Sequence, residues 1–268
     1  AANRSGACTI TITVRDGGGA TASEQFNFIV TAAEPQLLGF PNVFASSLEA
    51  ADCDGDGVLD TFLGGSELLL SGASRSYGGI LRGDGKGGFS EVKALPPSAW
   101  GNPWGVWGDY DDDGQLDLLY TGSVYRNDGG EFTQVWNELE SIAEGAGSWG
   151  DYDNDGRLDF AICGRPFITR IYHNDANGHF SDIHAPLQGV IRGTLDWCDT
   201  DGDGDLDLFV TGAASEVISA SEMARLYQNQ KGTFVETQQF LGVSNGQISW
   251  ADVNGDGLTD LVGFEKSA

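Results

Sequence analysis

Short apolar stretches separated by polar, glycine-rich turns run along the whole chain. The clearest pattern lies near the start, where apolar and polar residues alternate over residues 9–14 and again over 25–30, with the turn 16–19 between them. Alternation of this kind predicts two half-buried strands joined as a hairpin. A two-stranded hairpin is only marginally stable in water, so we expect this one to pair with further strands.

Elsewhere the apolar stretches are runs of two or three residues, which are too short for helices and suit strands buried on both faces. These runs are residues 61–63, 118–120, 160–162, 208–210 and 261–262. Each run follows one of five acidic segments that align without gaps. These segments are residues 52–60, 109–117, 151–159, 199–207 and 252–260. They begin 42 to 57 residues apart, close to the period of roughly 40–50 residues that is typical of four-stranded propeller blades.

A second signature follows four of the acidic segments, in which Asn, Asp and Gly residues are flanked by aliphatic or aromatic ones. It covers residues 81–89, 125–132, 172–180 and 227–234. Such a cluster predicts a hairpin. Each repeat therefore reads as strand, acidic loop, strand, connection, strand, tight turn and strand, which is one propeller blade. The predicted fold is an all-β propeller of four-stranded blades, with about five blades in residues 36–268 and the N-terminal hairpin in residues 1–35.

The fifth repeat reaches residue 268 after its second strand and shows no outer hairpin of its own. Three roles for the N-terminal hairpin therefore stay open. It could complete the fifth blade of its own chain, or it could complete a blade of a neighbouring copy and so build dimers or open fibres. It could also be the remainder of a preceding domain.

Asp occupies positions 1, 3, 5 and 9 of the acidic segments and Gly occupies position 6, with Asn254 at position 3 of the last one. Ca²⁺ takes six to eight oxygen ligands at roughly 2.3–2.6 Å, and alternate side chains of a tightly curled loop can converge on one such ion. Gly permits the sharp turn. Position 7 would offer only its backbone carbonyl, which explains why its residue type varies. The predicted ligands are Asp52, Asp54, Asp56, Val58 and Asp60; Asp109, Asp111, Asp113, Gln115 and Asp117; Asp151, Asp153, Asp155, Arg157 and Asp159; Asp199, Asp201, Asp203, Asp205 and Asp207; and Asp252, Asn254, Asp256, Leu258 and Asp260.

These loops differ from an EF-hand, which needs a Glu at position 12 and flanking helices. Position 12 here falls in a predicted strand, so we expect the Asp at position 9 to take the bidentate role. Mg²⁺ is disfavoured because it keeps most of its water. Without a cation the carboxylates would repel one another, by roughly 4 kcal/mol for two unit charges about 4 Å apart at an effective dielectric near 20. We therefore expect about five Ca²⁺ ions, one in each loop.

A Trp lies two residues before four of the loops, as Trp107, Trp149, Trp197 and Trp250. Together with the acidic loops and the Tyr-x-Asn hairpins, this pattern resembles the FG-GAP/VCBS repeat family over about residues 42–264. The resemblance implies an integrin-α-like propeller with calcium bound in the loop of each blade, held by each matching Asp and by Asn254. Such propellers commonly have more blades than the five visible here. Residues 9–30 are similar to the closing strands of bacterial cadherin-like or immunoglobulin-like repeats.

Composition narrows the possible partners. With 40 acidic and 14 basic residues the net charge is −26, which disfavours nucleic acid because phosphate binding needs a basic surface. No apolar run approaches the roughly 18 residues of a membrane span. The four cysteines, Cys8, Cys53, Cys163 and Cys198, form no CxxC pair, and their even number is compatible with disulfides in an oxidising compartment or with free thiols. The sequon at Asn3 also fits a secreted or cell-surface protein.

We therefore expect an extracellular adhesion or ligand-binding module with structural Ca²⁺, whose ligand is a carbohydrate or a protein. The alternative is a structural subunit of a surface layer or filament, joined by self-assembly through the donated hairpin. A polysaccharide-active enzyme is favoured least, because nearly all patterned acids are assigned to metal and no Ser or Cys nucleophile motif is present.

The tryptophan and histidine residues raise two further questions about exposed binding surfaces. The regular Trp series predicts packing between blades rather than a glycan platform, whereas Trp100 and Trp104 stand apart from it and are candidates for an exposed aromatic contact. His173, His179 and His184 lie within twelve residues of one another, and their polar neighbours predict solvated surface histidines.

Overall fold

The computed structural model describes an all-β protein through residues 6–15, 21–30, 43–68, 74–98, 101–139, 142–216, 222–240, 248–251, 253 and 260–263. The chain divides into two compact units, Ala1–Gly39 and Phe40–Ala268. Each unit is described by itself.

The first unit is the hairpin that the alternating sequence predicts. Strand β1 (Gly6–Arg15) pairs antiparallel with β2 (Thr21–Val30), in a regular register that runs from Gly6 opposite Val30 to Arg15 opposite Thr21. The two strands form a sheet of their own. Which blade they complete stays a prediction.

The second unit contains four antiparallel sheets of four strands, each a simple meander, followed by a two-stranded sheet. The first sheet consists of β3 (Val43–Ala51), β4 (Asp60–Leu68), β5 (Ser74–Gly83) and β6 (Phe89–Ala94). The second consists of β7 (Gly105–Gly108), β8 (Asp117–Tyr120), β9 (Ser123–Asp128) and β10 (Glu131–Trp136). The third consists of β11 (Ala143–Gly150), β12 (Asp159–Arg165), β13 (Ile168–Asn174) and β14 (Phe180–Asp182). The fourth consists of β15 (Leu195–Cys198), β16 (Asp207–Ala213), β17 (Glu222–Asn229) and β18 (Phe234–Phe240), and the last pair is β19 (Ile248–Ala251) and β20 (Asp260–Gly263).

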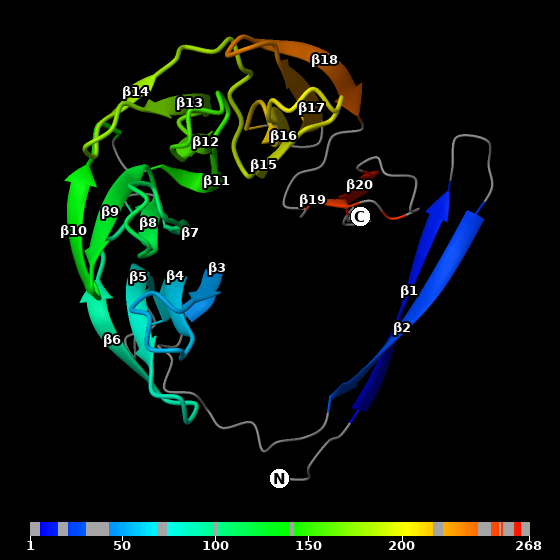
Figure 1. Cartoon of the computed structure of the whole chain (residues 1–268). Helices are drawn as coiled ribbons and strands as arrows, with labels where there is room; N and C mark the ends of the chain where they lie inside the picture. The colour runs from blue at the N-terminus through cyan, green and yellow to red at the C-terminus, as the bar shows by residue number, and fades with distance from the viewer. Residues whose placement is uncertain are drawn as a thin grey trace. The chain divides into compact units, whose positions relative to one another are not determined.

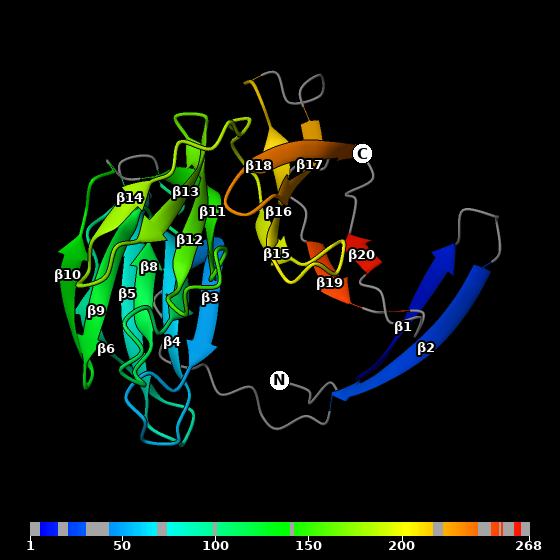
Figure 2. The same cartoon turned by 45° about the horizontal axis from the view of Figure 1, so that its top comes forward.

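Successive sheets lie side by side through their first strands. Strand β3 contacts β7, β7 contacts β11, β11 contacts β15 and β15 contacts β19. The fourth strands β6, β10, β14 and β18 form the opposite edges of their sheets (Figures 1 and 2). The order of strands and loops within each sheet is therefore the one that the sequence predicts for a blade. The described residues show no closed ring, so the complete propeller stays a prediction.

The core lies between neighbouring sheets rather than within one. Phe62 of β4 meets Tyr120 of β8 edge-on, with ring centroids 5.7 Å apart. Trp136 of β10 meets Phe160 of β12 in the same way at 5.4 Å. The second strands are buried on both faces, as their short apolar runs predict: every residue of β8 and of β16 is buried. Hydrophobic burial along these strands thus holds successive sheets together.

The Trp residues before the loops pack between sheets, as predicted. Trp149 of β11 stacks on Tyr110, with ring centroids 6.3 Å apart and planes 12° apart, and Trp197 of β15 stacks on Tyr152 in the same way. Gly108 leaves the space that this packing needs, because a Cβ built there would lie 2.6 Å from Trp149. The Trp-Gly-Asp-Tyr pattern therefore links one sheet to the next.

Two expectations about exposed aromatic residues have different outcomes. Trp104 is only 6% exposed and belongs to the core cluster between the second and third sheets, so the prediction that it offers an exposed contact is wrong. It lies just before β7, where Gly147 of β11 approaches its ring closely. Trp100 lies outside the described residues.

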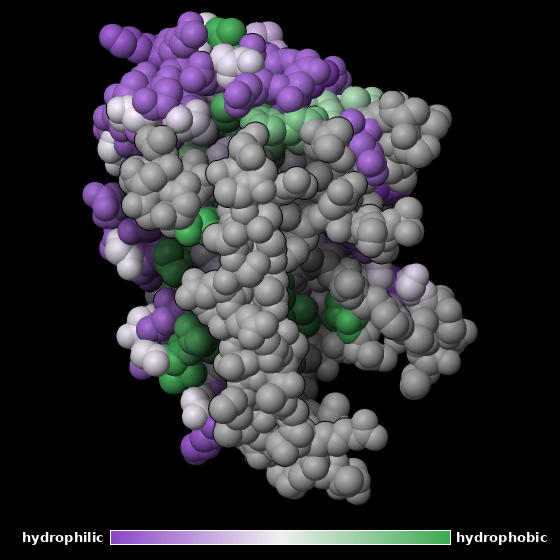
Figure 3. Space-filling view, turned by 90° about the vertical axis from the view of Figure 1, so that its right-hand side faces the viewer, coloured by the Kyte–Doolittle hydropathy of each residue, from purple (hydrophilic) through white to green (hydrophobic). Residues whose placement is uncertain are grey.

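Figure 3 shows one face of the molecule. Towards the top of this view the described residues are mainly hydrophilic, in keeping with the acidic composition. Cys53 and Cys163 are buried free thiols. Within the described residues, no helix has the length and apolar character that crossing a membrane requires.

Candidate metal centres

Four acidic loops join the first and second strands of the four-stranded sheets, as predicted. In each of them Gly at position 6 has a positive φ, for example 83° at Gly57 and 88° at Gly156. Position 4 is left-handed as well, with φ of 57° at Asp112 and 59° at Asn154. Only Gly, Asn and Asp tolerate this conformation readily, which explains why position 4 holds one of these three residues in every loop.

The loops bring carboxylates of the predicted ligand set together. Ligand oxygens of positions 1, 3 and 9 lie within 4.8 Å of one another in the first three repeats, and those of positions 1, 3 and 5 do so in the fourth. These groups are Asp52, Asp54 and Asp60; Asp109, Asp111 and Asp117; Asp151, Asp153 and Asp159; and Asp199, Asp201 and Asp203. Oxygen-only clusters of this kind fit a hard cation such as Ca²⁺.

Position 5 of the first three loops is not a member of these groups, although Asp155 forms a separate group with Asp153 and His173. Oδ1 of Asp56, of Asp113 and of Asp155 accepts the N–H of position 7 in the same loop, at 2.7 to 2.9 Å. In the fifth repeat, Asp252, Asn254, Asp256 and Leu258 lie outside the described residues. Asp260 begins β20, but its side chain is not described.

Hydrogen bonds within each loop hold its curled shape. Asp151 Oδ1 accepts the N–H of Asp155 at 3.0 Å, and its Oδ2 accepts the N–H of Gly156 at 2.9 Å. Asp109 makes the same two bonds in the second loop. The position 1 side chain thus orders the loop around its own carboxylate.

The Asp at position 9 is buried and tied to two segments of its repeat. Asp159 Oδ2 accepts the N–H of Tyr152 at 3.2 Å, and its Oδ1 accepts the N–H of Asn174 on β13 at 2.7 Å. Asp117 makes the equivalent bonds to Tyr110 and Asn127. This carboxylate therefore connects the loop to the third strand, and whether it also binds a metal in bidentate fashion stays a prediction.

The electrostatics of position 9 favour a nearby cation. Burial raises the pKa of Asp117 and of Asp159 to about 7, even though their backbone hydrogen bonds lower it. Within the second loop, burial and the charges of Asp113 and Asp109 also raise the pKa of Asp111. A cation among these carboxylates would compensate their charge and lower these pKa values.

An Asn at the end of the third strand joins the second, third and fourth loops each to the preceding one, and the sequence reasoning missed this role. Asn174 Nδ2 donates to the carbonyl of Tyr110 at 2.9 Å, and Asn229 Nδ2 donates to that of Tyr152 at 2.7 Å. Asn127 makes the same contact to Cys53. The available signal is the Asn that recurs in the Tyr-x-Asn hairpin signature, but the sequence pattern alone indicates only a turn residue.

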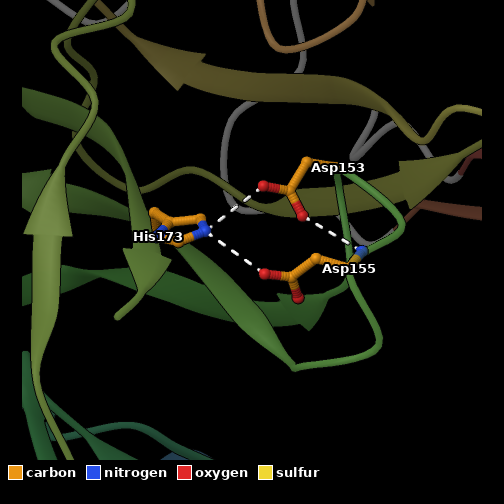
Figure 4. Close-up of side chains that lie close together, drawn as sticks. All are labelled: Asp153, Asp155 and His173. Atoms are coloured by element: carbon orange, nitrogen blue, oxygen red, sulfur yellow. Dashed lines mark hydrogen bonds and ion pairs between the residues drawn. The ribbon is translucent and has the colours of Figure 1, made fainter. Parts of the chain in front are cut away.

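In the third and fourth repeats, the residue just before this Asn contacts the acidic loop of its own repeat. In the third repeat it is His173, whose Nε2 lies 3.2 Å from Asp153 Oδ2 and 3.5 Å from Asp155 Oδ2 (Figure 4). Partial burial lowers the pKa of His173, but the hydrogen bond to Asp175 and the charges of Asp159 and Asp153 outweigh it and raise the pKa above its usual value. The prediction of a solvated surface histidine is thus wrong for His173, whereas His179 and His184 are exposed.

Comparison with protein families gives the same repeat. A family model described as an FG-GAP-like repeat matches residues 151–210 and 199–263. Residues 151–263 are FG-GAP-like repeats. Each match begins at position 1 of an acidic loop, the third and the fourth, and the second one extends to the end of β20. The repeats of this family thus coincide with the loop-and-sheet units of the structure.

Comparison with solved structures supports the fold. The crystal structure of the V. cholerae biofilm matrix protein Bap1 matches with a TM-score of 0.51 and 22% sequence identity, over 76% of this chain and 30% of that chain. The search of curated proteins found no matching relative. The likeness to Bap1 shows a shared fold over less than a third of that protein.

Proposed function

We propose that the protein is an extracellular calcium-binding β-propeller, which acts as an adhesion or matrix module and binds a carbohydrate or protein ligand. One observation carries the proposal: a cluster of three loop carboxylates recurs in four successive sheets, and each of these four repeats buries the Asp at position 9. A solvent-exposed acidic turn would have no need to bury a carboxylate, because burial of an uncompensated charge is costly.

Calcium would be structural in this proposal. Each loop links the first two strands of its sheet, and the Asn and Trp contacts link that loop to the neighbouring sheet. Binding of an ion would therefore stabilise both a blade and its contact with the next one. Extracellular calcium modules bind with Kd of about 10⁻⁴–10⁻³ M, so calcium outside the cell would keep such loops occupied.

The extracellular and matrix role rests on the FG-GAP-like repeats and on the fold shared with a biofilm matrix protein. The acidic surface is consistent with a protein that stays soluble outside the cell. We propose no catalytic activity, because the patterned carboxylates are taken up by the loops. A glycan array probed with calcium-loaded protein tests the carbohydrate class of ligand, and a protein ligand is expected if no glycan binds.

Thermal unfolding in EDTA and in saturating CaCl₂ tests the structural role of calcium. We expect EDTA to lower the Tm and to expose the loops to proteases, because the carboxylates then repel one another without a cation. Asp151→Asn, which changes one predicted ligand, should reduce the calcium-dependent rise in Tm. A Tm and a protease pattern that are identical in EDTA and calcium would contradict the proposal.

A second candidate function is a subunit of a filament or surface layer. The observation in its favour is the strand count: β1–β2 and β19–β20 are sheets of two strands, whereas the other described sheets have four. Size measurement of the full chain and of a variant without residues 1–35 tests this function. Higher-order species that disappear with the truncation would support assembly through the hairpin, and monomers in both cases would refute it.

A further inference from the structure

One position varies in chemistry between repeats that are otherwise alike. It lies on the third strand, directly before the bridging Asn or its equivalent, and holds Arg82, Arg126, His173 and Gln228 in the four successive sheets. Arg82 Nε contacts Asp54 Oδ2 at 2.7 Å, and Gln228 Nε2 donates to Asp201 Oδ2 at 3.1 Å. In the first, third and fourth sheets the side chain at this position therefore reaches position 3 of the acidic loop, whereas Arg126 pairs with Asp128. In the third repeat this side chain carries an imidazole nitrogen.

Three candidate metal ligands lie close together in the third repeat, and both distances from the histidine nitrogen match those expected between ligands of one ion. His173 Nε2 and carboxylate oxygens of Asp153 and Asp155 all lie within 4.8 Å of one another, and the two nitrogen–oxygen distances are 3.2 and 3.5 Å. Bonds of about 2.0–2.2 Å to a tetrahedral ion place neighbouring ligands about 3.3–3.6 Å apart. Figure 4 shows the imidazole nitrogen directed at both carboxylates.

The imidazole is oriented from its other side. Asp175 Oδ1 lies 2.9 Å from His173 Nδ1, and the ring of Tyr152 packs edge-on against the imidazole with centroids 6.3 Å apart. A metal-binding histidine almost always donates its second N–H to a carboxylate or carbonyl in this way, which leaves the first nitrogen to face the ion. Asp175 is not one of the three ligands, and it holds the imidazole in the orientation that a metal site requires.

We propose that His173, Asp153 and Asp155 form a binding site for a first-row transition metal ion such as Zn²⁺ or Co²⁺. Imidazole nitrogen favours these ions over Ca²⁺, which prefers oxygen. The calcium position of the third loop uses Asp151, Asp153 and Asp159, so the two positions share only Asp153. The equivalent places in the other repeats carry Arg or Gln and are not expected to bind such ions.

One neighbouring charge opposes binding. Arg157 forms an ion pair with Asp155 Oδ2, and its Nε also donates to the carbonyl of Asn174 at 2.9 Å. The guanidinium must release that oxygen when a metal ion binds. We therefore expect Arg157→Ala to bind the transition metal more tightly than the wild type does.

Cobalt titration, followed by visible absorption and calorimetry in saturating CaCl₂, tests the site. The full chain should bind one Co²⁺ that Zn²⁺ displaces. His173→Gln, which installs the residue of the fourth repeat, should remove this binding while the Tm in calcium stays close to that of the wild type. Asp175→Asn should weaken it by about 10–100-fold, the usual effect of removing a group that orients a ligand. The control variants His179→Gln and His184→Gln should bind Co²⁺ as the wild type does.

Two outcomes would overturn the proposal: absence of saturable Co²⁺ binding by the wild type, and unchanged binding by His173→Gln. Absorption bands typical of a thiolate ligand would assign the ion to a cysteine and overturn it as well. Asp151→Asn separates the two metal proposals, because it should impair the calcium effect on Tm and leave Co²⁺ binding in place.

Transfer of the site to the fourth repeat gives a gain-of-function test. Asp201 and Asp203 already occupy the places of Asp153 and Asp155, but Gln230 stands where Asp175 orients the histidine. The double variant Gln228→His/Gln230→Asp should therefore bind a second Co²⁺ when the calcium concentration is lowered, because Asp201 and Asp203 both also belong to the calcium group of the fourth loop. A variant that binds no more Co²⁺ than the wild type at low calcium would show that these side chains do not make the site.

Discussion

The first and third repeats carry the same acidic loop but differ in how they contact other sheets. Asp60 and Asp159 are both buried and accept the same two kinds of backbone N–H bond. The third repeat also reaches back to the second sheet through Trp149 and Asn174. In the first repeat the equivalent positions hold Ala50 and Gly83, which have no side chain that could make these contacts.

The difference separates two structural roles within a repeat: the carboxylates that order the acidic loop, and the indole and amide groups that contact the preceding sheet. The first repeat keeps the loop carboxylates although its own positions for the indole and amide contacts hold Ala50 and Gly83, so the loop is not a by-product of these contacts. The indole and amide contacts are additions that tie one repeat to its predecessor. Substitutions in the two sets should therefore behave differently in the first and third repeats.

The largest effect is expected at position 9. Asp159→Ala would leave two buried backbone N–H groups without their acceptor, each costing about 1–3 kcal/mol, so unfolding by urea should show a loss of about 2–5 kcal/mol. Asp60→Ala removes the same bonds from the first repeat and should cost a similar amount. A loss below about 1 kcal/mol in both variants would contradict the conclusion that this carboxylate stabilises the fold by connecting the loop to the third strand.

Loss of the bridging Asn should lower the free energy of unfolding by less than loss of the position 9 Asp, and only in the repeats that have this Asn. Asn174→Ala removes the donors to Tyr110 and Leu158, and we expect a loss of about 1–3 kcal/mol in urea unfolding. Asn174→Asp is the matched control, since it keeps the size and the acceptor but loses the donors. Full stability of the Ala variant would show that this contact does not tie the sheets together.

A smaller effect is expected for the indole contact. Trp149→Phe removes the hydrogen bond from Nε1 to the carbonyl of Val106, which should cost about 0.5–1.5 kcal/mol beyond the loss of ring area. Trp136→Phe is the control, because within the described residues its buried Nε1 has no hydrogen-bond partner. Equal losses of stability in the two variants would mean that the indole bond between sheets contributes nothing.

The smallest effect is expected from pH, because titration changes the charge of the buried position 9 carboxylates but keeps their hydrogen-bond acceptors in place. Burial raises the pKa of Asp117 and Asp159 from 3.8 to about 7, so the folded state binds these protons more tightly than the unfolded state does. Their contribution to the stability of the metal-free protein is present below about pH 4 and is lost as the pH rises to about 7. Melting in EDTA across this range should show the decline, and saturating calcium should remove it. A Tm in EDTA that rises steadily over the same range would contradict the assignment.

The sequence predicted the parts of the molecule that depend on local order. The apolar runs, the acidic loops and the Asn/Gly turns gave the four strands of each sheet, because strand periodicity and turn chemistry act over a few residues. The role of the bridging Asn is not predictable from local sequence, because its partner lies far away in the chain. Tyr152, the partner of Asn229, is 77 residues away. The predictions for Trp104 and His173 are wrong for the same reason, since the burial of Trp104 and the pairing of His173 depend on neighbouring strands rather than on adjacent residues.

A crystal structure of the protein grown in saturating CaCl₂, with the anomalous signal of calcium measured, tests the central claim most directly. We predict one calcium peak in each of the first four loops, surrounded by the carboxylates of positions 1 and 3 and close to the buried Asp of position 9. Loops that are ordered as described but hold no cation at saturating calcium would contradict the claim that these loops are calcium sites.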